Sequence, residues 1–375
     1  MKVVHIIPTL RRGGAERLVI DIVRALAKRK DYNVRLLIFR NEIEYSIEDI
    51  KQFIVVIPAS VSLAVLNNNS YNITELQFFL EQFKPDVIHS HLFEAEIVSR
   101  SCDYPNAKWF SHCHDNMVQF KNFDFKTLID KTAVTNFYEK TYLLKRYHKN
   151  SGTTFIAISK NTFHYFSKNV KEFSTVYLPN AIQYDRFNNN TQKSISPSLP
   201  LRLINTGTFD DNKNQRFLID VADVLHKNCI SFEMHFLGDG KNKCSVQSYG
   251  ESLALADRIH FHGSVENVES YLWEADIYIH SAKSEALGLT LIEAMAAGLP
   301  VVTLDGKGNR DLIEAGKNGY MIYNQDANEF AAKLMDIWSN KKLLASMSIY
   351  ANQFAQKFNL DDYIKKLDAI YRSSY

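Results

Sequence analysis

Two acidic residues eight positions apart are the strongest chemical signal in the sequence. Glu285 precedes Gly288, and Glu293 follows it within a stretch of helical pattern that begins near Thr290. Backbone amides at the start of a helix have no partner in a preceding turn, so those of Gly288, Leu289 and Thr290 would suit a diphosphate. Glu293, about one turn inside the helix, could reach ribose hydroxyls beside the phosphates. The two glutamates alone would equally fit a surface helix whose acidic residue interacts favourably with the helix dipole.

A glycine pair near the amino terminus is a second candidate for contact with a substrate. Gly13 and Gly14 follow the apolar residues 2–7. Without side chains, this backbone can approach a diphosphate or a sugar closely. The pair is not a dinucleotide-binding pattern, because G-x-G-x-x-G is absent. A simple tight turn remains the alternative.

Histidines at a strand end form a third candidate. Alternation along residues 108–114 places His112 and His114 on one face and Cys113 on the other. A zinc site from His112, His114 and Asp115 is conceivable, but the sequence identifies neither a further ligand nor the supporting hydrogen bonds. We therefore expect no metal. A lone histidine at a strand end is also often structural.

Composition restricts the classes of protein that could carry these groups. The chain has 375 residues, is 46% hydrophobic and carries a net charge of only +2, which indicates two globular domains and no nucleic-acid partner. The amino terminus does not have the order of a signal peptide, and no segment is long and apolar enough to span a bilayer. The four cysteines lack C-x-x-C spacing, so reduced thiols and a cytoplasmic location are expected.

The elements that must position the candidate residues alternate between strands and helices. Residues 1–186 read as one βαβ series, residues 187–200 as a polar linker, and residues 201–353 as a second series. We expect an α/β protein with two Rossmann-like, doubly wound domains whose ligand-binding strand ends face a shared cleft. Residues 354–375 predict a C-terminal helix that packs back on the first domain.

The segment SEALGLTLIEAM, residues 284–295, followed by AGLPVV, resembles the E-x7-E segment of family 4 glycosyltransferases. Other motifs of that family occur in the same order along nearly the whole chain: GGAER at 13–17, PDVIHSH at 85–91, IAIS at 156–159, PNAI at 179–182 with Asp185 and Phe187, LGDG at 237–240, FHG at 261–263 and NG at 318–319. Each match is weak alone, and together they are specific. The resemblance implies the GT-B fold and transfer from a nucleotide sugar with retention of anomeric configuration.

The resemblance also implies roles for particular residues. His114, Glu285 and Lys213 are the expected catalytic residues, with His114 beside the donor sugar and His91 and Asp115 on the acceptor side. The expected donor-binding residues are Gly13, Gly14, Gly207, Thr208, Lys213, Gly238, Gly263, Gly288, Leu289, Thr290 and Glu293.

Lys213 matches the lysine of the family's phosphate-binding loop, where it would neutralise the leaving nucleoside diphosphate. The sequence departs from the family at Thr208, where arginine is common. A second cation would then come from Lys307 or Arg310, or be missing. Lys213 could also be an ordinary solvated loop lysine.

A basic stretch, KTYLLKRYHK at residues 140–149, bears on the acceptor. Its mixed aromatic, leucine and basic residues suit an amphipathic helix on an anionic membrane, and equally an ordinary solvated helix. On the first interpretation, the protein associates peripherally with the inner face of the plasma membrane and uses a lipid-linked glycan.

These observations favour a retaining, metal-independent glycosyltransferase of bacterial glycan synthesis, with no cofactor beyond its substrates. The resemblance makes a UDP-sugar the preferred donor and a glycan or lipid-linked glycan the acceptor. A glycosidase is disfavoured, because both glutamates lie on one element rather than on opposite sides of a glycosidic bond. Two alternatives remain: a GT-B-like nucleotide-sugar epimerase, and a non-catalytic partner subunit that binds a nucleotide sugar.

Overall fold

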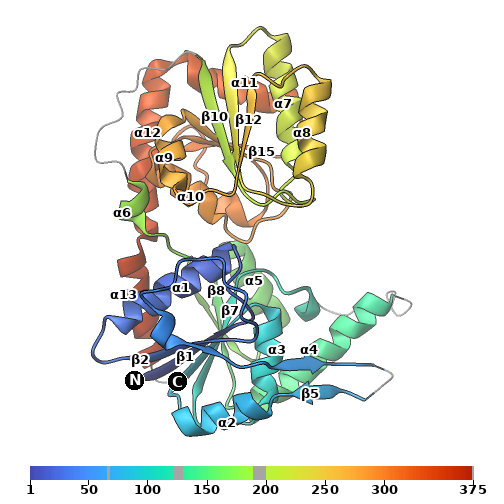
Figure 1. The fold of residues 1–375 in the computed structure, drawn as a ribbon, viewed down its shortest axis with the longest axis vertical. Coiled ribbons are helices and arrows are strands. Elements are labelled where there is room, and N and C mark those ends of the chain that lie inside the picture. Colours follow the sequence, from blue (N-terminus) through green and yellow to red (C-terminus); the bar gives the residue numbers. More distant parts are fainter. Residues whose placement is uncertain (66–67, 122–129, 189–199, 374–375) are drawn as a thin grey trace. The chain divides into compact units, whose positions relative to one another are not determined.

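The computed structural model describes residues 1–65, 68–121, 130–188 and 200–373. The chain folds into two compact units (Figure 1): Met1–Asn180 with Leu360–Tyr375, and Ala181–Asn359. Each unit contains a parallel sheet with helical connections. The prediction of two doubly wound α/β domains is therefore confirmed.

The first unit is built on a seven-stranded parallel sheet in the order β3-β2-β1-β6-β7-β8-β9. Its central strands are buried on both faces, as is usual for parallel sheets, although β1, β6 and β7 contain histidines and β6 and β7 also contain a serine. The strands are β1 (Lys2–Ile7), β2 (Asn33–Ile38), β3 (Ile54–Val56), β6 (Val87–His91), β7 (Lys108–Cys113), β8 (Thr154–Ala157) and β9 (Ser174–Tyr177), with a separate antiparallel pair β4 (Ser60–Ser62) and β5 (Ser70–Asn72). The helices are α1 (Gly14–Ala27), α2 (Thr74–Phe83), α3 (Phe93–Ser101), α4 (Lys131–Lys149), α5 (Lys160–Asn169) and the short η1 (Lys51–Phe53) and η2 (Val118–Phe120).

The second unit has a six-stranded parallel sheet in the order β12-β11-β10-β13-β14-β15. The strand order reverses between β10 and β13, and such a switch point is where doubly wound sheets bind ligands. The strands are β10 (Leu201–Thr206), β11 (Phe232–Leu237), β12 (Ile259–Gly263), β13 (Ile277–His280), β14 (Val301–Leu304) and β15 (Gly319–Ile322). The helices are α6 (Tyr184–Phe187), α7 (Gln215–Lys227), α8 (Lys243–Ser252), α9 (Val268–Glu274), α10 (Leu289–Ala296), α11 (Ala327–Ser339), α12 (Lys341–Ala355), η4 (Gly308–Asp311) and η5 (Gln356–Phe358).

The boundary between the units falls at Asn180, earlier than the expected residue 186. Contacts of α6 explain this difference. The Tyr184 hydroxyl donates to the Asn352 side chain at 2.8 Å, and the Trp273 indole donates to the Phe187 carbonyl at 2.6 Å. Most of the expected linker at 187–200 lies outside the described residues.

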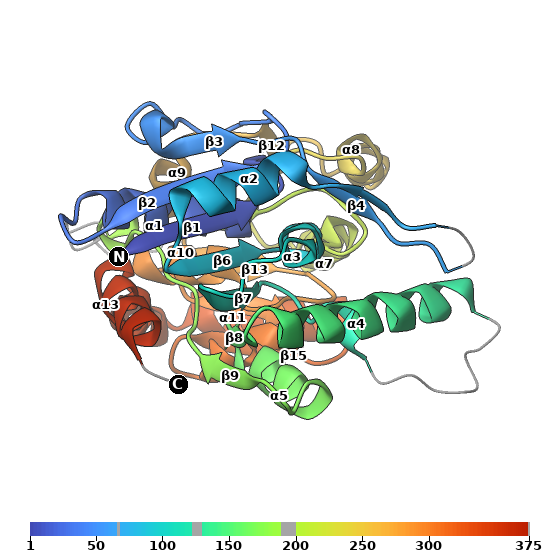
Figure 2. The ribbon, with the colours of Figure 1, turned by 90° about the horizontal axis from the view of Figure 1, so that it is seen from below.

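Helix α13 (Leu360–Arg372) returns to the first unit, so the predicted packing of a C-terminal helix is confirmed. The helix begins at Leu360 rather than 354, because residues 354 and 355 still belong to α12. It lies beside α1 in Figures 1 and 2. The Asp368 carboxylate accepts hydrogen bonds from Tyr32 and Arg29, and Lys108 Nζ donates to the Tyr371 carbonyl at 3.1 Å.

Helix α4 contains the basic stretch at 140–149. Its apolar side faces the core of the first unit, where Leu143 and Tyr147 are fully buried. Arg146 and Lys149 both donate to the Asp103 carboxylate, at 2.9 and 2.6 Å. The apolar side of the amphipathic pattern therefore packs within this unit, and Lys145, His148 and Lys149 are exposed. Among the described residues, none of the helices combines the length and apolar character needed to cross a bilayer.

Candidate functional site

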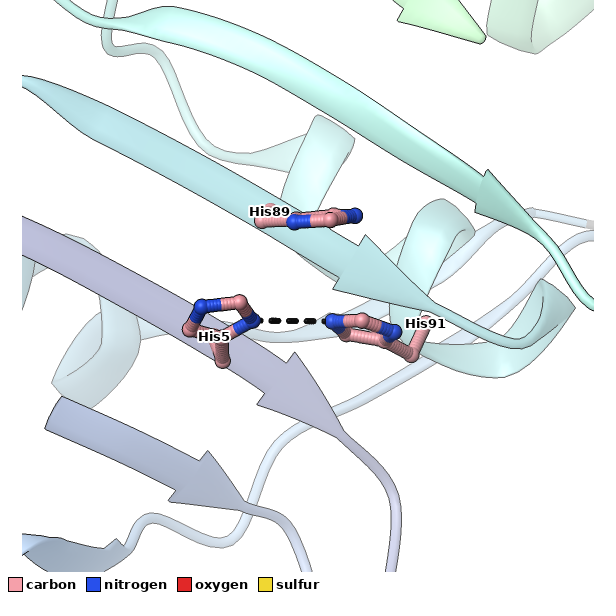
Figure 3. A group of neighbouring side chains, drawn as sticks. All are labelled: His5, His89 and His91. Carbon is pink, nitrogen blue, oxygen red and sulfur yellow. Dashed lines mark hydrogen bonds between the residues drawn. The ribbon is translucent and has the colours of Figure 1, made fainter. Parts of the chain in front are cut away.

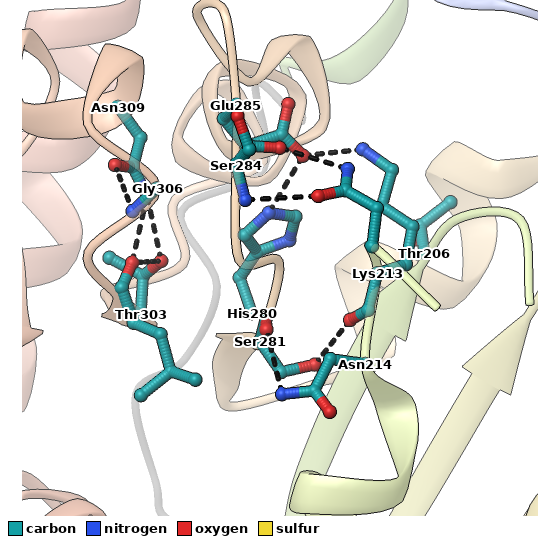
Figure 4. A network of polar contacts seen from close by, with 12 residues as sticks. Thr206, Lys213, Asn214, His280, Ser281, Ser284, Glu285, Thr303, Gly306 and Asn309 are labelled. Atoms are coloured by element: carbon teal, nitrogen blue, oxygen red, sulfur yellow. Dashed lines mark hydrogen bonds and ion pairs between the residues drawn. The ribbon is translucent and has the colours of Figure 1, made fainter. Parts of the chain in front are cut away.

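The Glu285 carboxylate is the centre of a polar cluster at the switch point of the second sheet (Figure 4). Its Oε1 accepts hydrogen bonds from Lys213 Nζ and from His280 Nε2, the latter at 3.0 Å. Burial opposes ionisation of this carboxyl, but the His280 hydrogen bond and the Lys213 charge outweigh it and lower the pKa of Glu285 to about 2. Glu285 is therefore an anion at neutral pH, held by two donors.

The backbone of Glu285 is fixed by the loop after β14. Its amide donates to the Gly306 carbonyl at 2.8 Å, and its carbonyl accepts from the Gly308 amide at 3.0 Å. A Cβ at Gly308 would lie 2.2 Å from the Glu285 and Ala286 carbonyl oxygens, so only glycine fits there. Asn309 secures this loop by accepting from the Gly306 amide and donating to Thr303 Oγ1, at 2.9 and 3.0 Å.

Lys213 is positioned by a loop that follows β10. The Asp210 carboxylate accepts from the Lys213 amide at 2.8 Å, and Ser281 Oγ donates to the Lys213 carbonyl at 2.8 Å. Asn212 exchanges two hydrogen bonds with the Ser284 backbone, at 2.9 and 3.0 Å. The β10 and β13 loops are thus held together, because their strands are neighbours in the sheet.

The predicted helix after Gly288 is α10, which begins at Leu289. Gly288 is its N-cap residue, with φ +95°, and Thr290 lies in its first turn. Among the described residues, no acceptor contacts the amides of Gly288, Leu289 or Thr290, so they are available to an anion. Glu293 is half-buried about one turn further along the helix.

Three predicted donor-binding glycines lie together at the carboxyl ends of β10, β11 and β12. The Gly207 amide donates to the Leu237 carbonyl at 2.9 Å, and the Gly238 amide donates to the Gly263 carbonyl at 2.7 Å. A Cβ on Gly238, whose φ is +131°, would lie 2.1 Å from the Gly207 carbonyl oxygen. Close backbone approach accounts for glycine at that position. Thr208 is exposed beside them, and its carbonyl accepts from Gln215 Nε2 at 3.0 Å.

The two alternatives for a second cation differ in their contacts. Arg310 forms a two-pronged ion pair with Asp305, at 2.8 and 2.5 Å. Lys307 is exposed, pairs by its backbone with Glu285, and has no ion-pair partner among the described residues. Its φ of +68° is unusual for a lysine. Of these two residues, Lys307 is therefore the one whose side chain has no ion-pair partner among the described residues.

The glycine pair and Asp115 lie in the first unit. Gly13 is the N-cap residue of α1, and Gly14 is the first residue of that helix. The Tyr45 hydroxyl accepts from the Gly13 amide and donates to its carbonyl, at 3.0 and 2.9 Å. Asp115 is exposed, and its carboxylate accepts from the Met117 amide at 2.7 Å. That contact defines a local turn.

His114 is half-buried after β7, and its Nε2 lies 3.0 Å from His91 Nδ1. His91 is fully buried, so it offers no exposed surface for direct contact with an acceptor. His112 is also buried and contacts His89 and Asn180 instead.

Sequence reasoning missed His280, which holds Glu285, and Asn212 and Asn309, which hold the loops. The only sequence signal for His280 is a polar residue directly after the apolar strand residues 277–279. The asparagine roles depend on loops that meet only in the folded chain.

The chain thus has two Rossmann-like units, and the second unit carries a cluster of charged residues beside a helix start at the switch point of its sheet. Two family models match: glycosyl transferases group 1 over residues 187–354, and glycosyltransferase family 4 over residues 12–186. The chain belongs to family 4 of the glycosyltransferases.

Named relatives agree with this family. Poly(ribitol-phosphate) alpha-N-acetylglucosaminyltransferase of Staphylococcus aureus (strain COL) is 28% identical over 158 residues, which cover 42% of this chain and 32% of that protein. N-acetyl-alpha-D-glucosaminyl L-malate synthase of Bacillus anthracis is 26% identical over 218 residues, 56% of each chain. The match to either relative thus spans less than two thirds of that relative's length.

Solved structures share the fold. Anabaena Alr3699/HepE, crystallised with UDP and glucose, superposes with a TM-score of 0.77 over 100% of both chains at 17% identity. Sucrose-phosphate synthase from Thermosynechococcus elongatus superposes with a TM-score of 0.78 over 99% of this chain and 98% of that chain, also at 17% identity. These similarities establish a GT-B architecture.

Proposed function

We propose that this protein is a retaining glycosyltransferase that moves a sugar from a nucleoside-diphosphate sugar to a glycan or lipid-linked glycan. The observation that carries the proposal is the Lys213–Glu285–His280 cluster beside the start of α10. An oriented lysine and open helix amides are groups that stabilise a departing diphosphate. The names of two relatives, a poly(ribitol-phosphate) alpha-N-acetylglucosaminyltransferase and a lipopolysaccharide core biosynthesis glycosyltransferase, support a role in surface-glycan synthesis.

The residues have distinct proposed roles. Lys213, with Lys307 as second cation, neutralises charge on the leaving diphosphate, and the amides of Leu289 and Thr290 bind its oxygens. Glu293 binds the ribose hydroxyls. Glu285 holds the Lys213 ammonium in place. The protein supplies positioning and electrostatics for same-face attack, in which the departing phosphate takes the acceptor proton.

In the first unit, His114 contacts a hydroxyl of the bound sugar, Gly13 and Gly14 allow close approach of substrate, and Asp115 contributes to acceptor binding. UDP is the preferred nucleotide, because the fold is shared with a structure that holds UDP and glucose.

A donor screen tests the function directly. We expect one class of nucleotide sugar among UDP-, GDP- and ADP-sugars to raise the Tm of the full chain. Glu293→Ala should weaken that donor about 10- to 100-fold, as expected for loss of a charged hydrogen bond of about 1.5–3 kcal/mol. Glu329→Ala, an exposed glutamate of α11, is the matched control and should bind normally.

Product analysis separates the alternatives. The proposal is supported if the products are free nucleoside diphosphate and a glycoside whose anomeric configuration is the same as that of the donor sugar. An isomerised nucleotide sugar would identify an epimerase instead. Binding of donor without any turnover, in the presence of lipid-linked acceptors from the same surface-glycan class, would indicate a binding subunit.

Metal independence is the second prediction of the proposal. Lysine side chains and helix amides can supply the positive potential that a divalent cation supplies in other nucleotide-sugar sites. Transfer rates measured in excess EDTA should therefore equal those without chelator. Loss of activity that Mg²⁺ or Mn²⁺ restores would refute this expectation.

We also propose peripheral association with anionic membranes through the exposed side of α4. Lys145, His148 and Lys149 are exposed on that helix. Replacing Lys145, Arg146 and Lys149 with glutamine should reduce co-sedimentation with phosphatidylglycerol vesicles, because each basic residue contributes about 1 kcal/mol near such a surface. The control replaces Lys333, Lys341 and Lys342 in the second unit. Unchanged sedimentation of the α4 variant would exclude this surface.

A further inference from the structure

Five histidines gather along the central strands of the first unit, from the middle of β1 and β6 to just beyond the carboxyl end of β7. His5 lies on β1, His89 and His91 on β6, His112 on β7, and His114 directly after β7. Strand register places His5 opposite His89 and His91 opposite His112. Figure 3 shows His5, His89 and His91, with His5 and His91 joined by a hydrogen bond. The first four are fully buried, and His114 is half-buried.

The five rings form one hydrogen-bonded chain together with Tyr371 of α13 and Asn180. Each ring that makes two of these hydrogen bonds uses one nitrogen for the first and the other nitrogen for the second. From one end to the other, the links are His114 Nε2 to His91 Nδ1 at 3.0 Å, His91 Nε2 to His5 Nδ1 at 3.0 Å, His5 Nε2 to Tyr371 Oη at 3.5 Å, Tyr371 Oη to His89 Nδ1 at 2.5 Å, His89 Nε2 to His112 Nδ1 at 3.2 Å, and His112 Nε2 to Asn180 Oδ1 at 2.9 Å.

These rings are neutral in the folded protein. Burial lowers the pKa of all five histidines, and their mutual repulsion as cations adds to this for His5, His89, His91 and His114. A neutral imidazole has one N–H donor and one acceptor nitrogen. If one ring donates through Nε2, its Nδ1 must accept. The neighbouring ring must then donate to that Nδ1 through its own Nε2.

Two contacts set the direction of donation. The Asn180 side-chain oxygen accepts, so His112 donates through Nε2. The 2.5 Å contact between Tyr371 and His89 has the short length typical of a hydroxyl donor, so the phenol donates to His89 Nδ1. Both assignments require His89 to donate through Nε2 to His112. The Tyr371 oxygen then presents its lone pairs to His5 Nε2, which favours an N–H there.

We propose that all the hydrogen bonds in this series of rings donate in the same direction. This keeps His114 in the Nε2–H tautomer and leaves its Nδ1 as a hydrogen-bond acceptor for the substrate. Within the described part of the structure, no group forms a hydrogen bond with His114 Nδ1. An acceptor at that atom binds a sugar hydroxyl and rejects a phosphate or carbonyl oxygen, which can only accept. Tyr371, His5 and His91 are thus positioning residues for His114. The substrate contact of His114 rests on the proposed function.

A metal ion is the competing explanation, because His5, His89 and His91 have ligand nitrogens within 4.8 Å of one another. The contacts favour the hydrogen-bonded chain. The nitrogens are already paired, and the 3.0 Å between His5 Nδ1 and His91 Nε2 is shorter than the roughly 3.3 Å expected between two ligands 2.0–2.1 Å from a tetrahedral zinc. Ligating histidines usually donate to a carboxylate or carbonyl, whereas these donate to one another.

Nitrogen-15 NMR of the full chain with labelled histidine tests the tautomer directly, since the two nitrogens of a neutral ring have different shifts in each tautomer. A His114→Gln sample assigns the His114 resonances. We expect Nε2–H in the unsubstituted protein and a mixture of tautomers in Tyr371→Phe, which keeps the ring against Phe110 but removes the hydroxyl. Tyr363→Phe is the matched control, because this buried tyrosine of α13 has a hydroxyl without a partner.

Kinetics provide the second readout. Tyr371→Phe should lower kcat about 3- to 10-fold, the effect of weakening one neutral hydrogen bond, without changing the KM for the donor nucleotide. His114 in the Nδ1–H form, a tautomer unaffected by Tyr371→Phe, or stoichiometric zinc in the purified protein would each overturn the proposal. If His114 is in the Nε2–H tautomer but the protein transfers no sugar, the proposed function is contradicted and the tautomer assignment is still supported.

Discussion

Replacing Lys213 with methionine is expected to lower the rate of sugar transfer about 100- to 1000-fold, the usual effect of removing one group that stabilises charge in a transition state. Methionine keeps an unbranched side chain of nearly the same length and removes the ammonium group, with its charge and its hydrogen-bond donors. The effect should fall mainly on kcat, because negative charge on the diphosphate increases as the bond to the sugar breaks. Initial rates at saturating donor measure it.

The control for Lys213→Met is Lys342→Met, an exposed lysine at the start of α12. This substitution also removes one positive charge and should leave the rate of sugar transfer unchanged. The donor-induced rise in Tm shows whether the Lys213 variant still folds and binds. Equal rates for Lys213→Met and the unsubstituted enzyme would remove Lys213 from the catalytic site and leave its ion pair with Glu285 as a structural contact only.

Replacing Arg100 with methionine is expected to destabilise the first unit by roughly 3–5 kcal/mol, the usual cost of breaking a buried ion pair by removing one partner. Arg100 is fully buried, with its Nε 3.1 Å from the Glu96 carboxylate. Its guanidinium also donates to the Gly152 carbonyl at 3.0 Å and lies 4.3 Å from the Trp109 ring centroid. Without it, Glu96 would remain buried with no cation.

Urea unfolding of the full chain, combined with hydrogen exchange of β6 and β7, measures this loss in the unit that contains Arg100. Arg146→Met is the matched control, since Arg146 pairs with the exposed Asp103 and such a pair contributes only about 0–1 kcal/mol. The double variant Arg100→Met/Glu96→Gln should recover part of the loss, because the uncompensated charge is gone. An Arg100 variant as stable as the Arg146 variant would contradict this account.

Local pattern was enough to predict most of the fold. Short segments rich in Val, Ile and Leu, such as residues 2–7 and 201–206, predict strands, and helical spacing between such segments predicts the βαβ connections. The site in the second unit was partly predictable for the same reason. Lys213 and Glu285 follow strands that doubly wound topology places side by side, and the glycine before α10 marks the helix start.

Other features could not be predicted, because they depend on contacts between distant segments. His280 could be recognised as the second donor to Glu285 only from the fold, since its ring direction depends on the β13 backbone and the loop above it. The 140–149 stretch has the pattern of a membrane-binding helix, yet Leu143 and Tyr147 are buried in the first unit. Periodicity identifies an apolar face and cannot identify what covers it.

The sequence by itself determined the family and the two α/β domains, and it indicated Lys213, Glu285, Glu293 and His114 as candidate site residues, because each belongs to a local motif. Only the tertiary structure decided which groups hold them. Tyr371 reaches His89 because α13 returns to the first unit, and His5, His91 and His114 meet because parallel register aligns strand ends. Hydrogen bonds depend on positions within a few tenths of an ångström, and residues far apart in sequence acquire such positions only through packing.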